Sequence, residues 1–252
     1  MKTALITGAT SGIGKEMAIY LHSKGWRLIL TGRNREMLHR MAKAFGSSTR
    51  TLAIDLSEHG AAGKLYEFCK GTRVDFLINN AGFGVFGSFT EAPLDRELEL
   101  IDVNIRALHI LTKLFLKDMT ARDSGVILNV GSIAGFSTGP LLSSYYASKN
   151  YVVRLTTAIR EELRRTGSNV QIGVLCPGPV NTQFNDRAGV SFSAKPADPR
   201  YVARYAIDQV LAGKCIILPS LIVKLGWVGM QLCPETIAAR FVYEFQKRKE
   251  KP

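Results

Sequence analysis

The stretch TALITGATSGIG, residues 3–14, decides the fold of this chain. Its first five residues form a short apolar and β-branched run, which predicts a buried strand, and the glycines that follow predict a turn into a helix. Glycines in such a turn let backbone N–H groups approach a phosphate, whose charge the helix N-terminus stabilises. Their spacing, G-x-x-x-G-x-G, is a weak signal alone, so the interpretation as a dinucleotide site depends on the position of the turn after the first strand. A purely structural turn is the alternative.

The rest of the chain repeats this alternation of short apolar runs and longer helical patterns. Apolar residues three and four apart, such as Leu108, Leu111 and Phe115, indicate helices between the runs. Near-continuous apolar strands that alternate with helices predict a parallel, doubly wound sheet with helices on both faces. No repeat, linker or compositional break divides the 252 residues, so we expect a single domain spanning 1–252. The seven strand candidates are residues 3–7, 27–31, 50–54, 74–79, 125–130, 170–175 and 215–218.

The composition excludes several function classes. The formal net charge is +12, but the basic residues are scattered and no nucleic-acid motif accompanies them, so we expect no nucleic-acid partner. The four cysteines are too widely spaced for a zinc knuckle or a redox pair, so no metal site is expected and the thiols are taken as reduced. The first apolar run is too short for a signal peptide. We therefore expect a cytoplasmic protein, with loose membrane association as an alternative.

The end of the second predicted strand bears on the choice of cofactor. A ribose 2′-hydroxyl is usually held by Asp or Glu about twenty residues after the glycines. Here Arg33 lies nineteen residues beyond Gly14, and no acidic residue occurs from Thr31 to Arg35. An arginine can pair with a 2′-phosphate, so NADPH (NADP) is favoured over NADH. The alternative is that Arg33 is a solvated loop charge.

Six motifs in order make the chain resemble the short-chain dehydrogenase/reductase superfamily. They are TGATSGIG at 7–14, NNAG at 79–82, VNI around Asn104, GSIAG at 131–135, YYASK at 145–149 and PGPVNT at 177–182. The resemblance runs through most of the chain. It implies a single-domain Rossmann-like α/β fold and NAD(P)-dependent oxidation of alcohols or reduction of carbonyls.

Two adjacent tyrosines compete for the catalytic role. Helical geometry places both Tyr145 and Tyr146 on the face of Lys149, so spacing alone leaves the choice open. The family motif is Tyr-x-x-x-Lys with a serine about a dozen residues upstream. That resemblance selects Tyr145 and Lys149, with Ser132 as the serine, and leaves Tyr146 for packing or substrate contact. By the same resemblance, Asn104 helps to hold a water chain that connects Lys149 to solvent.

The chemistry explains why a phenol and an ammonium occur together. Reduction of a carbonyl needs hydride at carbon and a proton at oxygen, but a free tyrosine has a pKa of about 10 and is a poor shuttle near neutrality. We expect Lys149, with the positive nicotinamide, to lower the pKa of Tyr145. Ser132 would donate a hydrogen bond to the substrate oxygen.

The resemblance also implies a set of cofactor contacts. Asp55, at the end of the third strand, corresponds to the residue that accepts a hydrogen bond from the adenine amino group, and Thr182 to the one that meets the carboxamide. The full expected set is Gly8, Thr10, Ser11, Gly12, Ile13, Gly14, Arg33, Asp55, Asn79, Ala81, Gly82, Tyr145, Lys149, Pro177, Gly178, Val180 and Thr182.

The substrate side is less clearly encoded. Residues 183–198 are typical of a flap over the active site, and Phe83, Val85 and Phe86 either line the cleft or pack beneath the flap. The apolar run 216–233 begins at the seventh strand and is interrupted by Lys224, so we expect a buried or substrate-covering element within a C-terminal hydrophobic extension, 219–246. A hairpin in peripheral contact with a membrane is the alternative.

These observations predict an NADPH-dependent oxidoreductase that reversibly reduces a ketone or aldehyde on an apolar substrate, such as a lipid-like, steroid or fatty-acyl compound. The alternatives are an NADPH-binding sensor or scaffold without useful turnover and an epimerase that recycles its cofactor. Apolar residues on more than one face of the helical patterns 104–121 and 144–166 favour a homodimer or homotetramer.

Overall fold

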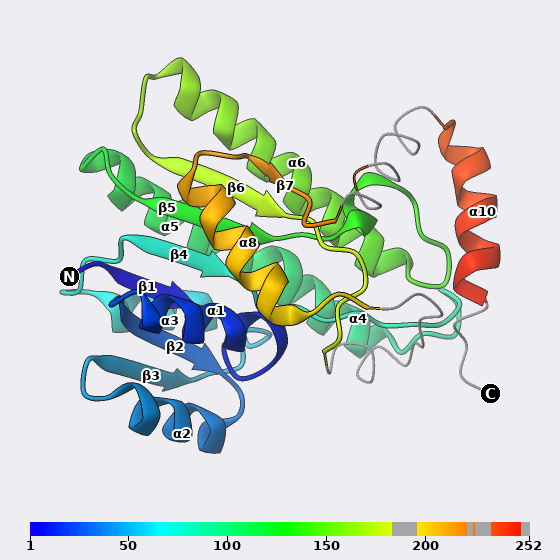
Figure 1. The fold of residues 1–252 in the computed structure, drawn as a ribbon. Helices are drawn as coiled ribbons and strands as arrows, with labels where there is room; N and C mark the ends of the chain where they lie inside the picture. Colours follow the sequence, from blue (N-terminus) through cyan, green and yellow to red (C-terminus); the bar gives the residue numbers. More distant parts are fainter. Residues whose placement is uncertain (183–195, 221–223, 225–232, 248–252) are drawn as a thin grey trace.

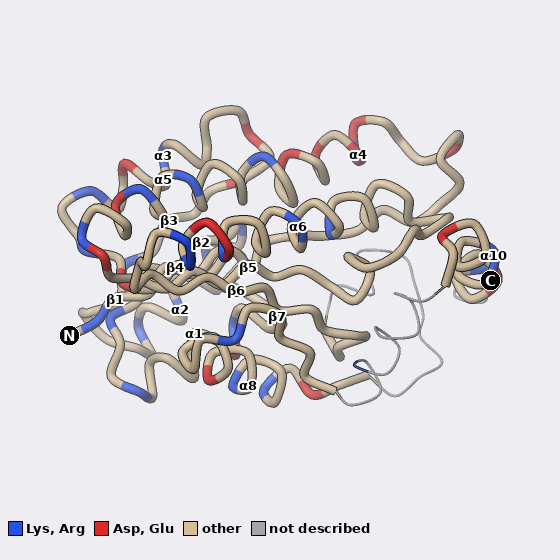
Figure 2. The backbone as a smooth tube through the Cα atoms, turned by 90° about the horizontal axis from the view of Figure 1, so that it is seen from above, with Lys and Arg blue, Asp and Glu red and all other residues tan. Residues whose placement is uncertain are grey.

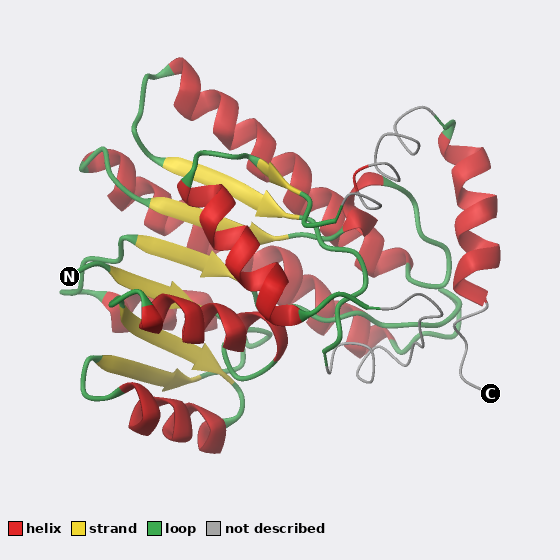
Figure 3. Cartoon of the chain, in the orientation of Figure 1, coloured by secondary structure: helices red, strands yellow, loops and turns green. Residues whose placement is uncertain are grey.

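Seven parallel strands form one sheet at the centre of the protein, in the order β3-β2-β1-β4-β5-β6-β7 (Figures 1 and 3). The computed structural model describes residues 1–182, 196–220, 224 and 233–247. All seven predicted strands are found, which confirms the single-domain Rossmann-like α/β fold. The strands are β1 Thr3–Ile6, β2 Arg27–Gly32, β3 Thr49–Ala53, β4 Phe76–Asn79, β5 Val126–Val130, β6 Gln171–Leu175 and β7 Ile216–Ile217.

Helices cover both faces of this sheet (Figure 1). On one face lie α1 Gly12–Ser23, α2 Arg35–Phe45 and α8 Pro199–Leu211. On the other face lie α3 Ala61–Cys69, α5 Leu108–Ala121 and α6 Ser143–Arg165. Figure 2 shows that Lys and Arg are spread over the helices of both layers.

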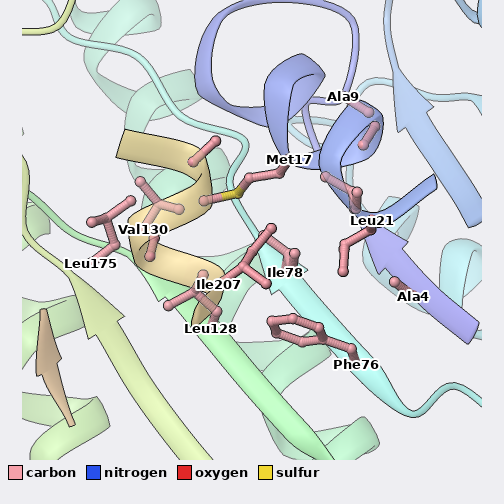
Figure 4. Packing of buried hydrophobic residues seen from close by; sticks show 14 of the residues in the cluster. Ala4, Ala9, Met17, Leu21, Phe76, Ile78, Leu128, Val130, Leu175 and Ile207 are labelled. Atoms are coloured by element: carbon pink, nitrogen blue, oxygen red, sulfur yellow. The ribbon is translucent and has the colours of Figure 1, made fainter. Parts of the chain in front are cut away.

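Strand periodicity divides the core into two hydrophobic clusters. Successive side chains of a strand point to opposite faces, so Ala4 and Ile6 pack toward α1 and α8 whereas Leu5 packs toward α3 and α5. Figure 4 shows the first cluster, in which Met17 and Ile207 approach each other from the two helices above the sheet. The sheet is therefore buried on both faces, as the near-continuous apolar strands predict.

The strand order reverses beside β1, because the chain crosses to β2 and β3 on one side and returns to β4 on the other. In open α/β sheets the carboxyl ends of the strands at such a switch point border a crevice that binds ligands. The loops after β1 and β4 thus meet at one place, and this place holds the candidate site.

The long helical pattern before β5 is interrupted. It consists of α4 Leu94–Ile101, a π-helical turn η1 Asp102–Ala107, and then α5. The expected helix 104–121 therefore begins inside a π-helix, and Asn104 lies in it. π-Helical turns are rare and occur frequently at functional sites.

The last described helix, α10 Glu235–Lys247, lies outside the two helical layers, beyond the carboxyl ends of the strands (Figure 1). The expected run 216–233 begins with β7 and has Lys224 in a helical conformation, while 221–223 and 225–232 lie outside the described residues, as does most of the expected flap, 183–195. Within the described ranges, no helix has the combined length and apolar character that crossing a membrane requires. All four cysteines are free.

Candidate active site

A cavity of about 580 Å³ opens at the carboxyl edge of the sheet. Loops after β1, β2, β3, β4, β5 and β6 contribute to it, together with the start of α6 and the end of α10. The structure brings most of the predicted site residues into its lining: Gly8, Thr10, Ser11, Gly12, Ile13, Arg33, Asp55, Ala81, Gly82, Ser132, Tyr145, Lys149, Pro177, Gly178, Val180 and Thr182. Gly14, Asn79 and Asn104 do not line it.

The glycine turn is held by close backbone packing. Gly8 has a φ of +64°, and a Cβ there would lie 2.9 Å from the Cα of Ala81. A Cβ at Gly14 would lie 2.5 Å from the carbonyl oxygen of Gly8 and 2.3 Å from Nδ2 of Asn80. Gly14 therefore acts beneath the cavity, since only a residue without a side chain leaves room for the amide that supports the turn.

The amide that supports the turn belongs to Asn80, a residue that the sequence analysis did not single out. Its Nδ2 donates to the carbonyl oxygens of Thr7 at 2.9 Å and Gly8 at 3.0 Å. In return, Oγ1 of Thr7 accepts from the backbone N–H groups of Asn80 and Ala81, both at 3.0 Å. These bonds join the loops after β1 and β4.

Asn79, the predicted contact, faces the opposite way. Its Nδ2 donates to Oγ1 of Thr112 and Oδ1 of Asn129, so its side chain is committed to a buried polar cluster between β4, β5 and α5. The strand alternation explains the difference, since Ile78 packs toward α1 and the next side chain must point to the other face. Because NNAG contains two adjacent asparagines, the motif alone does not show which asparagine side chain points into the cavity.

The N-terminus of α1 fits an anionic group. The helix begins at Gly12, and the side chain of Ser11 at its N-cap makes no capping hydrogen bond. The first N–H groups of the helix are therefore not used by that cap and point toward the turn. A nicotinamide dinucleotide fits this arrangement, because its diphosphate is an anion and the N-terminus of a helix favours negative charge.

Arg33, in the loop after β2, and Asp55, in the loop after β3, meet at the edge of the cavity. Nη1 of Arg33 lies 3.5 Å from Oδ2 of Asp55, and the arginine side chain is 54% exposed. Burial alone would raise the pKa of Asp55, but hydrogen bonds from the N–H and hydroxyl of Ser57 and the charge of Arg33 outweigh it, so the pKa lies below its ordinary value. Asp55 is therefore a charged acceptor at neutral pH, and Arg33 remains accessible to a ligand.

Ser132, Tyr145 and Lys149 converge on one wall. Ser132 follows β5, and its hydroxyl acts on the Tyr145 hydroxyl as a hydrogen-bonding neighbour that favours a lower phenol pKa. Lys149 is 4% exposed, its Nζ donates to the carbonyl oxygen of Val130 at 2.8 Å, and Nζ lies 5.7 Å from the centre of the Tyr145 ring. Helix α6 places the phenol and the ammonium one turn apart on the same face, as the spacing predicts.

The pKa of Tyr145 departs from the prediction. Burial raises it above the ordinary value, and the hydrogen bond with Ser132 opposes this only in part. Without a bound cofactor, Lys149 does not bring the pKa of Tyr145 below its ordinary value. Its Nζ is hydrogen-bonded to the carbonyl oxygen of Val130, and burial has the larger effect on the phenol. The same burial lowers the pKa of Lys149 to about 8. Near neutrality the phenol is therefore protonated and able to donate.

Asn104 stands behind this wall. Its Oδ1 accepts from the N–H of Phe83 at 3.1 Å, and its Nδ2 donates to the carbonyl oxygen of Phe83 and to Oγ of Ser148. A Cβ at Gly82 would lie 2.9 Å from Oδ1 of Asn104 and 3.4 Å from Nζ of Lys149. Asn104 thus fixes the loop after β4 against α6, close to the ammonium.

The loop after β6 closes the cavity over the glycine turn. The carbonyl oxygen of Pro177 accepts from the N–H of Ile133 at 3.0 Å, which ties this loop to the one after β5. A Cβ at Gly12 would lie 3.0 Å from Cγ2 of Thr182, so Thr182 packs directly on the turn. Val180 forms a parallel bridge with Ala197, on the far side of the undescribed part of the flap.

The substrate side contains a contact that the sequence analysis missed. Gln246 of α10 lines the cavity, and its Nε2 donates to the hydroxyl of Tyr146 at 2.7 Å. Of the three hydrophobic candidates, Phe83 lines the cavity and Val85 and Phe86 do not. A signal existed for Gln246, since it lies eight residues after the buried Ala238 and so occupies the buried face of an amphipathic pattern.

Comparisons with known proteins agree with this geometry. Residues 2–190 match the protein family described as short chain dehydrogenase. An uncharacterized oxidoreductase of Staphylococcus aureus (strain MW2) is 31% identical over 214 residues, which cover 82% of this chain and 91% of that protein.

Two solved structures illustrate the likeness in fold. A short-chain dehydrogenase from Sphingobium yanoikuyae in complex with NADPH has 26% identity and a TM-score of 0.84, with 92% of each chain covered. A short chain dehydrogenase/reductase from Burkholderia phymatum in complex with NAD has 24% identity and a TM-score of 0.81, covering 92% of this chain and 96% of that one. The chain therefore belongs to the short-chain dehydrogenase family and is an NAD(P)-dependent oxidoreductase.

Proposed function

We propose that this protein is an NADPH-dependent reductase of apolar ketones or aldehydes. The observation that supports this best is the convergence of Ser132, Tyr145 and Lys149 on the cavity that also contains the glycine turn. A protein that only sensed a nucleotide would have no need for a phenol and an ammonium beside a serine hydroxyl.

The residues divide the chemistry as follows. A nicotinamide cofactor, when bound, provides the hydride that adds to the carbonyl carbon. Ser132 donates a hydrogen bond to the carbonyl oxygen and holds it beside Tyr145. The Tyr145 hydroxyl then transfers its proton to that oxygen, which completes the alcohol. The ammonium of Lys149 lies 5.7 Å from the centre of the Tyr145 ring and does not by itself lower the phenol pKa, so it would stabilise the remaining phenolate only together with the positive charge of a bound, oxidised nicotinamide.

The apolar substrate is inferred from the remaining wall. Hydrophobic side chains line the same cavity as the catalytic set, so a carbonyl group with an apolar body would be desolvated on entry. These side chains are Phe83, Ile133, Leu142, Val180 and Phe245.

A ketone and aldehyde panel with limiting NADPH tests the activity. We expect one mole of NADPH to be consumed per mole of alcohol formed, which also excludes an epimerase that recycles its cofactor. Tyr145→Phe should lower kcat/KM by about 10²- to 10⁴-fold, because the acid is removed. Wild-type turnover by Tyr145→Phe on an accepted ketone would show that the assignment is wrong.

The preference for NADPH rests on Arg33, whose exposed guanidinium makes a 3.5 Å contact with Asp55 and no other ion pair among the described residues. Arg33→Ala should weaken NADPH binding by about tenfold or more, since charge-assisted hydrogen bonds contribute roughly 1.5–3 kcal/mol, and should leave NADH binding nearly unchanged. Lys43→Ala is the matched control, because Lys43 is an exposed cation of α2 that lines neither the cavity nor the hollow beside Arg33. Equal losses for both cofactors, or a wild type that prefers NADH, would contradict this.

A further inference from the structure

Tyr146 and Gln246 form a polar pair in the cavity that the proposed catalytic set does not use. The two residues are 100 positions apart in the sequence and are joined by the 2.7 Å hydrogen bond from Nε2 of Gln246 to the Tyr146 hydroxyl. Both line the cavity in which Tyr145 lies. Helix α10 brings the amide there from beyond the carboxyl ends of the strands (Figure 1).

The pair has hydrogen-bonding capacity left over. Gln246 is fully buried, and its Oε1 has no hydrogen-bond partner within the described part of the chain. The Tyr146 hydroxyl accepts in its bond with the amide, so that bond does not use its own proton. A buried acceptor without a donor costs free energy in the folded protein, which makes it a candidate for pairing with a ligand.

The position of the pair is fixed by packing. A Cβ at Gly139 would lie 2.1 Å from Cγ of Tyr146, so the ring rests directly on the Gly139 backbone. On its other side the ring meets Tyr145 edge to face, with ring centres 6.2 Å apart. Tyr146 is therefore packed against both the Gly139 backbone and the phenol assigned to proton transfer.

From this geometry we propose that Tyr146 and Gln246 form a subsite for a hydroxyl group on the substrate. A hydroxyl both donates and accepts, so it can donate to Oε1 of Gln246 and accept from the O–H of Tyr146. The preferred substrate is then an apolar ketone or aldehyde that carries a hydroxyl group near the carbonyl. The reaction on such a compound rests on the proposed function, whereas the binding of its hydroxyl does not.

Matched pairs of ketones test the subsite by turnover. The probes are cyclohexanone against 4-hydroxycyclohexanone and acetophenone against 2-hydroxyacetophenone, with NADPH. Wild type should prefer the hydroxylated member of at least one pair by about tenfold or more in kcat/KM, since a site built around a hydroxyl rejects an analogue that lacks it. Gln246→Met and Tyr146→Phe should each reduce this ratio to about threefold or less.

Tyr243→Phe is the matched control, because it removes a hydroxyl from an exposed position of the same helix and should leave the ratio unchanged. Melting temperatures of all variants separate a lost subsite from a lost fold. A wild type without preference in either pair, or variants that lose both members equally while folded, would overturn the proposal.

Binding without turnover separates this proposal from the proposed function. Isothermal titration of the NADP-loaded protein with cyclohexanol and 1,4-cyclohexanediol should show tighter binding of the diol, by about tenfold or more, and loss of the difference in Gln246→Met. If no ketone is reduced but the diol is preferred, the subsite stands and the carbonyl reductase assignment fails. If ketones are reduced but neither the diol nor the hydroxyketones are preferred, the subsite is wrong and the reductase stands.

Discussion

The two ends of the cavity are assembled in different ways. At the cofactor end, Asn80 bonds to the carbonyl oxygens of Thr7 and Gly8, so two short motifs at neighbouring strand ends lock together through their backbones. At the substrate end, Tyr146 meets Gln246 of a helix outside both layers. Backbone packing tolerates few residue types, whereas a side-chain contact across 100 residues can change freely. Among related enzymes, residues at the substrate end should therefore vary with substrate specificity, whereas residues at the cofactor end should stay constant.

The largest expected effect concerns Lys149, which lines the cavity beside Tyr145. Burial lowers its pKa to about 8, against about 10.5 in the unfolded chain. Between these values the unfolded state binds the extra proton, so stability rises with pH. From pH 8 to 10.5 the free energy of unfolding should rise by up to about 3 kcal/mol more in wild type than in Lys149→Met.

Urea denaturation of both proteins at several pH values measures this gain, because groups common to both cancel. A difference that stays constant from pH 7.5 to 10.5 would mean that the ammonium is solvated and that the catalytic wall is not dry.

Gly14→Ala should break the cofactor end. The new Cβ would lie 2.3 Å from Asn80 Nδ2 and 2.5 Å from the carbonyl oxygen of Gly8, so the turn must shift. Overpacking of this kind costs about 1–3 kcal/mol, and we expect NADP binding to weaken by about 10- to 100-fold.

Gly63→Ala in α3 is the control, since a Cβ there meets nothing within 4 Å. It should raise the free energy of unfolding by about 0.5–1 kcal/mol and leave cofactor binding unchanged. Calorimetric titration with NADP measures the cofactor affinity of both variants, and urea denaturation measures their free energies of unfolding. Equal NADP affinities for the two variants would contradict the close packing of the turn.

Gly139→Ala should break the substrate end alone. Its Cβ would overlap the Tyr146 ring at 2.1 Å, so the ring must move. We expect kcat/KM to fall by about tenfold or more for accepted ketones, because displacement of about 1 Å near a reacting group is costly. The dissociation constant of NADP should remain that of wild type, and an equal loss in cofactor affinity would show that the two ends are not independent.

The adjacent asparagines give the smallest and sharpest contrast. Asn80→Ala should weaken NADP binding by about tenfold, because it removes two hydrogen bonds that shape the turn. Asn79→Ala should instead lower the free energy of unfolding by about 1–3 kcal/mol with cofactor affinity kept, because its bonds go to Thr112 and Asn129. Denaturation and titration of both variants decide, and the reverse pattern would exchange their roles.

The fold and most of the cofactor end could be predicted from sequence for a physical reason. Strand alternation and glycine turns are local, and parallel strands bring their carboxyl ends to one edge. The boundaries were close as well: the run 125–130 became β5 Val126–Val130, and the pattern 144–166 became α6 Ser143–Arg165.

The rest depends on information that local pattern does not contain. Whether Asn79 or Asn80 points into the cavity depends on the strand register. The π-helical turn at Asn104 cannot be distinguished from an α-helix by the spacing of apolar residues. The raised pKa of Tyr145 depends on burial, which residue type does not reveal. Gln246 reaches Tyr146 only through tertiary packing.

The central claim is that a substrate oxygen lies between Ser132 and Tyr145 and receives the phenol proton. A crystal structure with NADP and an alcohol product of an accepted ketone tests it most directly. We predict that the alcohol oxygen lies about 2.6–3.2 Å from both hydroxyl oxygens. An alcohol oxygen outside hydrogen-bonding reach of Tyr145, with another side chain in contact instead, would contradict it.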